Sequence, residues 1–162
     1  MLKLDAQLCF LLYATTRAVT QAYVPLLAPL GLTYPQYLTM IALWEADGVS
    51  VGSLGDRLHL DSGTVTPLIK RLEAMKLCER RRSTTDERVV HVFLTPEGRR
   101  LRSQAEGIPT AMACTAGVTS QSYDRLAHEL RQILATLAAA PTPDFETTPR
   151  PDLRPTSKEP AQ

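Results

Sequence analysis

The sequence is poor in the residues that build metal centres, disulfide frameworks and membrane spans. Its three cysteines, Cys9, Cys78 and Cys114, form no CxxC pair and have no histidine pair nearby, which argues against zinc and against a secreted disulfide framework. No apolar run approaches the roughly 18 residues of a membrane span, and the first residues show no signal-peptide pattern. We therefore expect a cytoplasmic protein that needs no cofactor and does not enter a membrane.

The sequence also lacks the local signatures of common enzymes. It has no glycine-rich phosphate loop and no recognisable Ser/His/Asp arrangement, so we predict that it is not an enzyme. Its net charge of +1 is unevenly distributed, because residues 57–102 hold 11 basic and 6 acidic side chains and the rest hold 7 and 11. Positive charge focused on one segment favours a nucleic-acid partner for that segment.

A helix-turn-helix pattern lies inside this positive segment. Asp61 and Ser62 are both suited to cap a helix start, and apolar residues follow at helical spacing. These are Val65, Leu68, Ile69, Leu72 and Met75. The opposite face carries hydroxyl groups and two cations, which bond to base edges or phosphates. The predicted DNA-binding residues of this recognition helix are Ser62, Thr64, Thr66, Lys70 and Arg71.

A basic β-hairpin is predicted directly after this helix. Three arginines ending in Arg82 enter a loop over residues 83–88, and β-branched residues 89–94 leave it. Arg88 at the tip, with Asp86 close enough to orient its guanidinium, is suited to enter a minor groove. We therefore add Arg82, Asp86 and Arg88 to the predicted DNA contacts. The alternative is a solvated hairpin whose charges only keep the protein in solution.

The flanking segments are predicted to be mostly helical. Helices are expected over 4–30, where Pro25 and Pro29 kink or end the helix, over about 33–46, and over 51–58 behind a Ser50 cap. Another starts at Thr95, runs to about 107–109 and resumes through Cys114, and the last covers 122–140 with a wide apolar stripe suited to a second subunit. Residues 141–162 hold six prolines and two large apolar residues, a composition typical of a disordered tail.

Helix geometry suggests a reason for a dimer. Tyr13 shares a face with Cys9, and Tyr23 returns to nearly the same face 14 positions on. At ~1.5 Å per residue, Cys9 and Tyr23 lie roughly 21 Å apart along one helix. If these two side chains meet, an antiparallel helix of a second subunit must bring them together.

This order of elements, with DSGTVTPLIKRLE followed by RRSTTDERVVHVFLTPEGRRL, closely resembles the MarR family of winged helix-turn-helix regulators over residues 4–137. The resemblance implies a mainly α fold with a small β-hairpin wing and with N- and C-terminal dimerisation helices. It divides the chain into a sensor and dimerisation helix (1–30), a DNA-binding domain (31–100), dimerisation helices (101–140) and a tail (141–162). The expected partners are a second copy of the chain and a double-stranded, pseudo-palindromic operator.

Cys9 with Tyr23 and Tyr34 resembles the organic hydroperoxide resistance repressors of this family, and Cys114 falls where their two-cysteine subtype has its resolving cysteine. The resemblance implies that Tyr23 and Tyr34 of one subunit approach Cys9 of the other. A sensing cysteine reacts as the thiolate, which two phenol donors would stabilise. Phe10, Leu12 and Tyr13 are candidates to line a pocket that favours organic hydroperoxides.

Other interpretations of these residues remain open. Cys9 on an apolar helix face fits an inert core cysteine, Cys114 fits core packing, and Cys78 is predicted to be structural. A regulator of the same family could instead answer a small phenolic or drug-like ligand, with Cys9 incidental. A thiol peroxidase is a third hypothesis, which the basic helix and hairpin disfavour.

Overall fold

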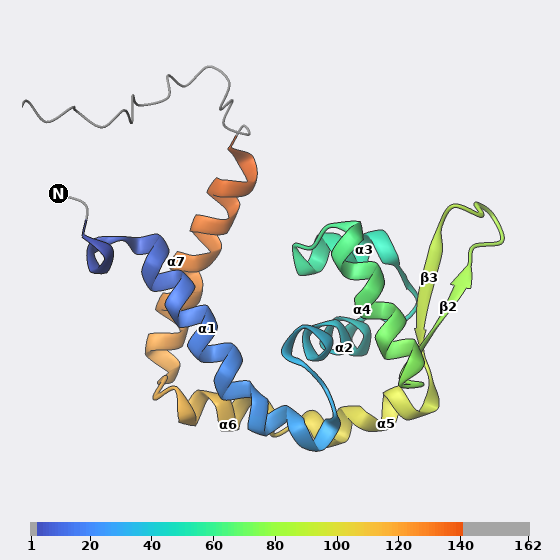
Figure 1. The fold of residues 1–162 in the computed structure, drawn as a ribbon, viewed down its shortest axis with the longest axis horizontal. Coiled ribbons are helices and arrows are strands. Elements are labelled where there is room, and N and C mark those ends of the chain that lie inside the picture. Colours follow the sequence, from blue (N-terminus) through green and yellow to red (C-terminus); the bar gives the residue numbers. More distant parts are fainter. Residues whose placement is uncertain (1–2, 141–162) are drawn as a thin grey trace, which may run out of the picture. The chain divides into compact units, whose positions relative to one another are not determined.

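The computed structural model describes residues 3–140, which form two compact units with a boundary between Val118 and Thr119. The predicted disordered tail, 141–162, lies outside the described residues. The first unit holds all described elements except the last helix (Figure 1). Among residues 3–140 no single helix is long and apolar enough to cross a membrane; only Leu8–Leu30 together with Tyr34–Glu45, bent by 67°, passes that test as a pair.

The first unit begins with α1 (Leu8–Leu27), which follows a short 3-10 turn, η1 (Leu4–Ala6), and leads into a second one, η2 (Ala28–Leu30). Pro25 lies inside α1, and the helix ends two residues later, close to where the prolines predict an end. Gly31 then adopts φ +66°, a left-handed conformation that glycine reaches at little cost. This turn positions the start of α2 (Tyr34–Glu45) beside the end of α1.

Helix α2 forms the centre of the first unit, packed against α1, α3 and α4. Its start is closed by a capping box, in which the Gln36 side chain accepts the Thr33 N–H at 2.8 Å. Met40 and Leu43 of α2 are fully buried against the apolar stripe of α4. The core therefore surrounds α2, whose two ends reach the α1 side and the sheet side of the unit.

The helix-turn-helix consists of α3 (Val51–Leu58) and α4 (Ser62–Ala74). Ser50 caps α3 as predicted, since its hydroxyl accepts the Ser53 N–H. Val65, Ile69 and Leu72 of α4 are at most 1% exposed, which confirms most of the predicted stripe. Met75 does not belong to that stripe, because α4 ends at Ala74 and the Met75 side chain is exposed.

The wing is a three-stranded antiparallel sheet rather than a hairpin alone. Strands β2 (Cys78–Arg82) and β3 (Val90–Leu94) pair in the register Arg80 to Val92. A third strand, β1 (Val49–Ser50), pairs with the other edge of β3, giving the order β1-β3-β2. A two-residue strand is too short to show alternation, so the sequence pattern gave no sign of β1.

Two helices complete the first unit. Helix α5 (Pro96–Ala105) starts behind the predicted Thr95 cap and ends before Gly107, and α6 (Ile108–Thr115) resumes beyond it. The second unit, over the described residues, is α7 (Ser120–Ala139). It starts two residues before the predicted Ser122, because Thr119 is the cap and Ser122 bonds back to it. The mainly α fold with a small wing is thus confirmed.

Candidate functional site

The start of α4 is held by Asp61, which settles the choice between Asp61 and Ser62 as the cap. One Asp61 oxygen accepts the Thr64 N–H at 2.9 Å and the other accepts the Thr64 hydroxyl at 3.0 Å. These bonds, the hydroxyl first, lower the pKa of the Asp61 carboxyl. The cap thus fixes the first turn, on which the predicted DNA-contacting hydroxyls lie.

The predicted DNA-binding residues of α4 are presented at the surface with one exception. Ser62, Thr64, Lys70 and Arg71 are exposed, whereas Thr66 is half-buried. Among residues 3–140, neither Lys70 nor Arg71 forms a salt bridge with a described carboxylate. Both cations therefore remain available to phosphate oxygens.

The wing is tied to α4 by Arg80, a residue that the sequence analysis did not select. The Glu73 carboxylate accepts the Arg80 backbone N–H at 3.0 Å and its Nε at 2.8 Å. These hydrogen bonds lower the pKa of Glu73. Both carboxylate oxygens of Glu73 are thus bonded to Arg80, and charge-assisted hydrogen bonds of this kind are stronger than neutral ones, so strand β2 and helix α4 are held in one orientation.

The wing tip contains the contact expected between Asp86 and Arg88. One Asp86 oxygen accepts the Arg88 backbone N–H at 3.0 Å and the Arg88 Nε at 3.3 Å, while the Arg88 side chain is 92% exposed. Arg82, the last residue of β2, is also exposed. The side chains of both arginines are thus exposed to solvent.

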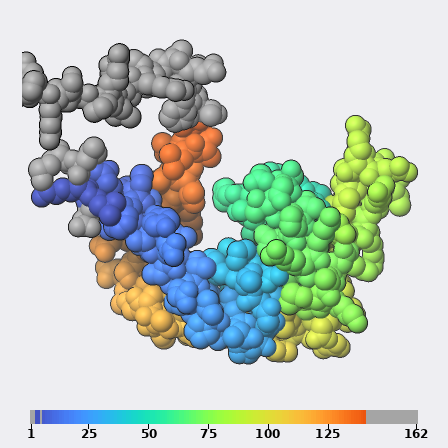
Figure 2. Space-filling view, in the orientation of Figure 1, coloured from blue at the N-terminus to red at the C-terminus, as the bar shows by residue number. Residues whose placement is uncertain are grey.

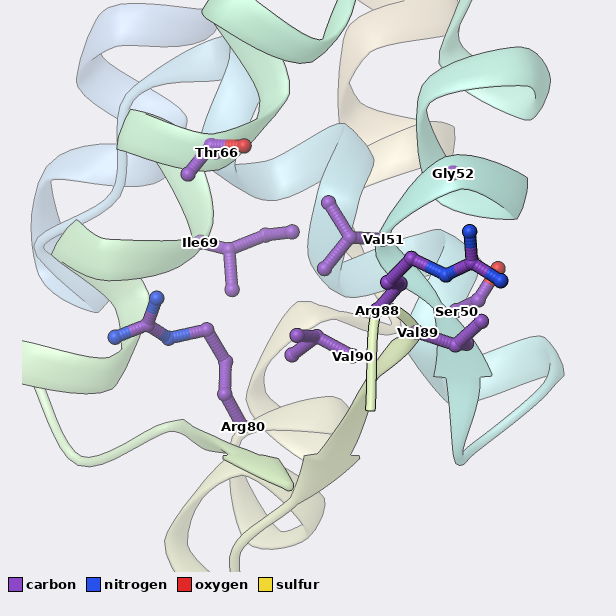
Figure 3. Close-up of a pocket in the computed structure, with 9 residues that line it drawn as sticks. All are labelled: Ser50, Val51, Gly52, Thr66, Ile69, Arg80, Arg88, Val89 and Val90. Carbon is purple, nitrogen blue, oxygen red and sulfur yellow. The ribbon is translucent and has the colours of Figure 1, made fainter. Parts of the chain in front are cut away.

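A groove of about 400 Å³ separates the wing from α3 and α4 (Figure 3). Its apolar walls come from all three parts, through Val51, Ile69 and Val90, and Arg80, Arg88 and Thr66 add polar groups. The residues that line it come from four separate segments of the sequence, so no local pattern could have indicated it.

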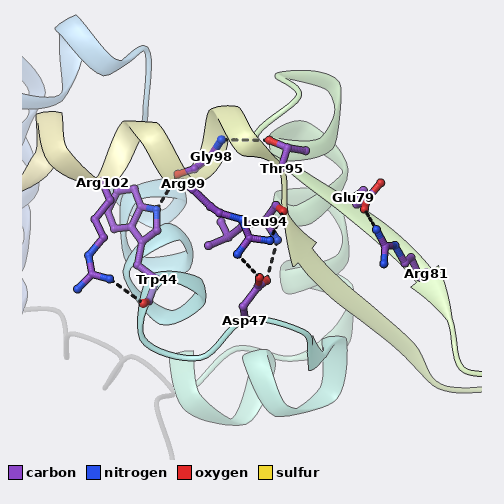
Figure 4. Close-up of polar contacts among 9 residues, drawn as sticks. All are labelled: Trp44, Asp47, Glu79, Arg81, Leu94, Thr95, Gly98, Arg99 and Arg102. Carbon is purple, nitrogen blue, oxygen red and sulfur yellow. Dashed lines mark hydrogen bonds and ion pairs between the residues drawn. The ribbon is translucent and has the colours of Figure 1, made fainter.

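The base of the wing is fastened to the end of α2 (Figure 4). The Asp47 carboxylate accepts the Leu94 N–H at 2.7 Å and an Arg99 N–H at 2.6 Å. The Trp44 indole Nε1 donates to the Gly98 carbonyl oxygen at 2.8 Å. From the sequence, Asp47 marked only a break after a helix, because its partners lie about 50 positions later.

The two tyrosines that the family resemblance singles out lie together. The ring centroids of Tyr23 on α1 and Tyr34 on α2 are 4.5 Å apart, and Tyr37, which the sequence analysis missed, lies 5.9 Å from Tyr23. Burial raises the pKa of all three phenols, so each remains protonated near neutral pH. Among residues 3–140, none of these hydroxyls forms a hydrogen bond with a described group.

The cysteines occupy different environments. Cys9 on α1 and Cys114 on α6 are exposed free thiols, whereas Cys78 is 2% exposed. The Cys78 Sγ lies 3.8 Å from the Ile69 carbonyl oxygen, and burial raises its pKa to about 12. This agrees with the structural role predicted for Cys78.

The residues proposed to surround Cys9 are less enclosed than the tyrosine cluster. Phe10 and Leu12 are half-buried, and Tyr13 is exposed, with its hydroxyl accepting an Arg17 N–H at 3.2 Å. Within the described part of the chain, no group of three or more His, Cys, Asp or Glu side chains is arranged to hold a metal ion.

Known proteins match most of this chain. The family profile described as transcriptional regulator SarA/Rot matches residues 21–104. The organic hydroperoxide resistance transcriptional regulator of Bacillus subtilis (strain 168) is 43% identical over 136 residues, which cover 84% of this chain and 92% of the relative. The HTH-type transcriptional regulator TtmR of Methylorubrum extorquens (strain PA1) is 47% identical over 136 residues, 84% of this chain and 66% of that relative.

Solved structures of AbfR of Staphylococcus epidermidis share the fold. The crystal structure of AbfR is 34% identical, with a TM-score of 0.71 over 85% of this chain and 95% of that one. The overoxidized AbfR bound to DNA is also 34% identical, with a TM-score of 0.67 over 83% of this chain and 94% of that one.

Proposed function

The chain belongs to the MarR/SarA family of winged helix-turn-helix transcriptional regulators, and we propose that it is a repressor that releases its operator when organic hydroperoxides oxidise Cys9. The observation that carries this proposal is the 43% identity with a regulator named for organic hydroperoxide resistance. The exposed Cys9 thiol and the tyrosine pair support it. A protein that acts in this way on DNA is expected in the cytoplasm.

The proposed DNA contacts follow from the arrangement of α4 and the wing. The α4 hydroxyls Ser62 and Thr64 face base edges in a major groove, and Lys70 and Arg71 bind the phosphates beside it. The wing tip, with Arg88 oriented by Asp86, enters the adjacent minor groove, and Arg82 contacts the backbone. Binding as a homodimer places two such surfaces on a pseudo-palindromic operator.

The proposed redox step is a two-electron oxidation of Cys9. The thiolate attacks one oxygen of the hydroperoxide, the O–O bond breaks, and a sulfenic acid forms while the alkoxide leaves and takes up a proton to become an alcohol. A second thiol, Cys114 of the partner subunit, then displaces water from the sulfenic acid to give a disulfide. Cys114 is suited to this role because its thiol is exposed.

Tyr23 and Tyr34 have the properties that a thiolate-stabilising pair requires. Their raised pKa values keep both phenols protonated, and hydrogen bonds donated to a charged thiolate favour that form. The proposal places the Cys9 of a second subunit against this pair, since one straight helix holds Cys9 and Tyr23 roughly 21 Å apart. Phe10, Leu12 and Tyr13 would then contact the organic part of the hydroperoxide.

The test combines gel electrophoresis and DNA binding on wild type, Cys9→Ser and Cys114→Ser. The probe is a duplex selected by the wild-type protein from a random-sequence pool, and the oxidant is cumene hydroperoxide. Oxidised wild type should form a covalent dimer on a non-reducing gel and lose DNA affinity by roughly 5- to 150-fold, a usual size for coupling between two sites. Cys9→Ser should bind DNA and ignore the oxidant.

This test can refute the proposed roles of Cys9 and Cys114 separately. Release of DNA from oxidised Cys9→Ser would refute the sensing role of Cys9. A covalent dimer that persists in Cys114→Ser would refute only the resolving role of Cys114. Cys78→Ala serves as a control, because the buried Cys78 thiol takes no part in the proposed step.

A second candidate function is a regulator of the same family that a small phenolic or drug-like ligand releases from DNA. The groove between the wing and α4 favours it, because apolar walls with the polar groups of Thr66, Arg80 and Arg88 suit a small aromatic ligand. Release by such a ligand should persist in excess thiol and in Cys9→Ser, which distinguishes it from the redox mechanism. The thiol peroxidase hypothesis is not retained, because the family consists of transcriptional regulators.

A further inference from the structure

We propose that Tyr37 and Trp44 are positioning residues that connect the Tyr23–Tyr34 pair to the base of the wing. This inference rests on the proposed function, because it concerns how oxidation at Cys9 changes the segments that contact DNA. Three successive contacts within the first unit support the inference.

The first contact joins the tyrosine pair to the core. Tyr37 is 3% exposed, and its ring lies 5.9 Å from the Tyr23 ring at a tilt of 41°. Tyr23 in turn lies 4.5 Å from Tyr34. Because protein interiors are packed as densely as organic crystals, a displacement of Tyr23 or Tyr34 must be accommodated by the buried Tyr37 ring.

The second contact runs along α2. Tyr34, Tyr37 and Trp44 follow one another at spacings of three and seven, which places them on one face of the helix. The Tyr37 and Trp44 rings meet edge to face, with centroids 6.4 Å apart at 70°, a preferred geometry for aromatic pairs. Ring contacts thus lead from the Tyr23–Tyr34 pair through Tyr37 to Trp44 at the other end of α2.

The third contact passes from Trp44 to the wing (Figure 4). The indole Nε1 donates to the Gly98 carbonyl oxygen at 2.8 Å. Gly98 is pressed so closely against the Leu77 carbonyl, just before β2, that a Cβ there would lie 2.0 Å from the Leu77 oxygen. Three residues beyond Trp44, Asp47 accepts the Leu94 N–H at the end of β3. The segment at the end of α2 therefore bonds the base of β3 directly and is connected to the base of β2 through Gly98 of α5.

Helix α2 is therefore the element that connects the tyrosine pair to the wing. When the chemistry at Cys9 displaces the pair, these ring contacts shift the indole against Gly98 and thereby re-aim the wing. A purely structural role for Trp44 predicts a different outcome, in which its substitution weakens folding or DNA binding equally in both redox states.

The test compares Trp44→Phe with wild type on the selected duplex, before and after cumene hydroperoxide. Phenylalanine keeps an aromatic ring and removes the N–H donor together with the five-membered ring of the indole. Reduced Trp44→Phe should bind DNA as wild type does, while the ratio of oxidised to reduced dissociation constants should fall about 2- to 30-fold. Tyr37→Leu should lower the ratio as well, and Tyr37→Phe, which keeps the ring, should restore it.

A second measurement uses the only tryptophan of the chain. Because the indole N–H is engaged with Gly98, a shift of this bond should change the emission maximum of Trp44 on oxidation. Wild type should show the change, and Cys9→Ser should not.

The results separate the two proposals. The positioning role alone would be overturned if Trp44→Phe left the affinity ratio unchanged or lost DNA binding equally in both redox states. It would also be overturned if the Trp44 emission maximum stayed the same while oxidation released the DNA. A wild-type protein that keeps its DNA after Cys9 is oxidised would refute the proposed function and this inference with it.

Discussion

At the scale of single residues, burial separates the three cysteines. Cys78 lies in the core beside the Ile69 carbonyl, whereas Cys9 and Cys114 are exposed on α1 and α6. Reactivity requires thiolate and access, and Cys78 has neither. Its position at the start of β2, with its thiol buried beside Ile69 of α4, makes it a packing residue.

Alkylation should distinguish these thiols. At pH 8, iodoacetamide is expected to label Cys9 and Cys114 of the native protein and to reach Cys78 only after urea unfolding, as counted by mass spectrometry. The pKa of Cys78, about 12 when folded against an ordinary 9.0, has a further consequence. Above pH 9 the unfolded thiol loses its proton first, so the free energy of unfolding should fall as the pH rises. Rapid labelling of native Cys78 would contradict this assignment.

Whether a contact of the candidate site could be predicted depends on how far apart its two residues lie in the sequence. The Asp86–Arg88 contact joins residues two positions apart and was predicted from the sequence. The contact between the Tyr37 and Tyr23 rings and the Trp44–Gly98 bond join different elements. A single sequence carries no signal for such contacts, because they depend on the relative placement of α1, α2 and α5.

At the scale of elements, local caps explain why most helix starts were predicted correctly. The hydroxyls of Ser50 and Thr95 and the carboxylate of Asp61 each accept a backbone N–H three residues on, which is a signal within one turn. The start of α7 was misplaced because both Thr119 and Ser122 are cap-forming residues. Strand β1 was missed because its pairing with β3 is long-range.

The junction of α5 with the wing should tolerate no added methyl group. Gly98→Ala is expected to lower the free energy of unfolding by about 1–3 kcal/mol, a common cost of overpacking, because its Cβ would meet the Leu77 carbonyl oxygen at 2.0 Å. Gly107→Ala is the matched control, since a Cβ there has no heavy atom within 4 Å. Urea unfolding of both variants measures the difference, and equal stabilities would contradict the close contact.

At the scale of the whole molecule, both units leave apolar surface exposed. Helix α1 exposes Leu8, Leu11 and Val24, and α7, taken by itself, exposes large apolar residues at helical spacing. Those on α7 are Tyr123, Leu126, Leu134 and Leu137. Apolar surface gathered on one face marks an interaction site, which supports the proposed homodimer.

Charge placed on the α7 stripe should separate the subunits. Leu126→Glu with Leu134→Glu is expected to shift the protein from dimer to monomer in sedimentation velocity, because the carboxylates would have to be buried unpaired. DNA affinity should fall with it, since a monomer contacts only one half-site. Gln132→Glu, on the polar side of the same helix, should remain dimeric. A double variant that stays dimeric would show that α7 does not form the interface.

The three-stranded wing has a consequence for how such a protein diversifies. Its base is fixed on both sides, by β1 pairing with β3 and by Arg80 bonding to Glu73, and the Ser83 N–H closes the ladder on the Val89 carbonyl. The loop between Ser83 and Val89 takes no part in these contacts. Insertions, deletions or exchange of this short loop alter the reach of the wing along DNA without disturbing the core. Under the proposed function, the target preference of the wing can therefore change while the Cys9 site stays the same.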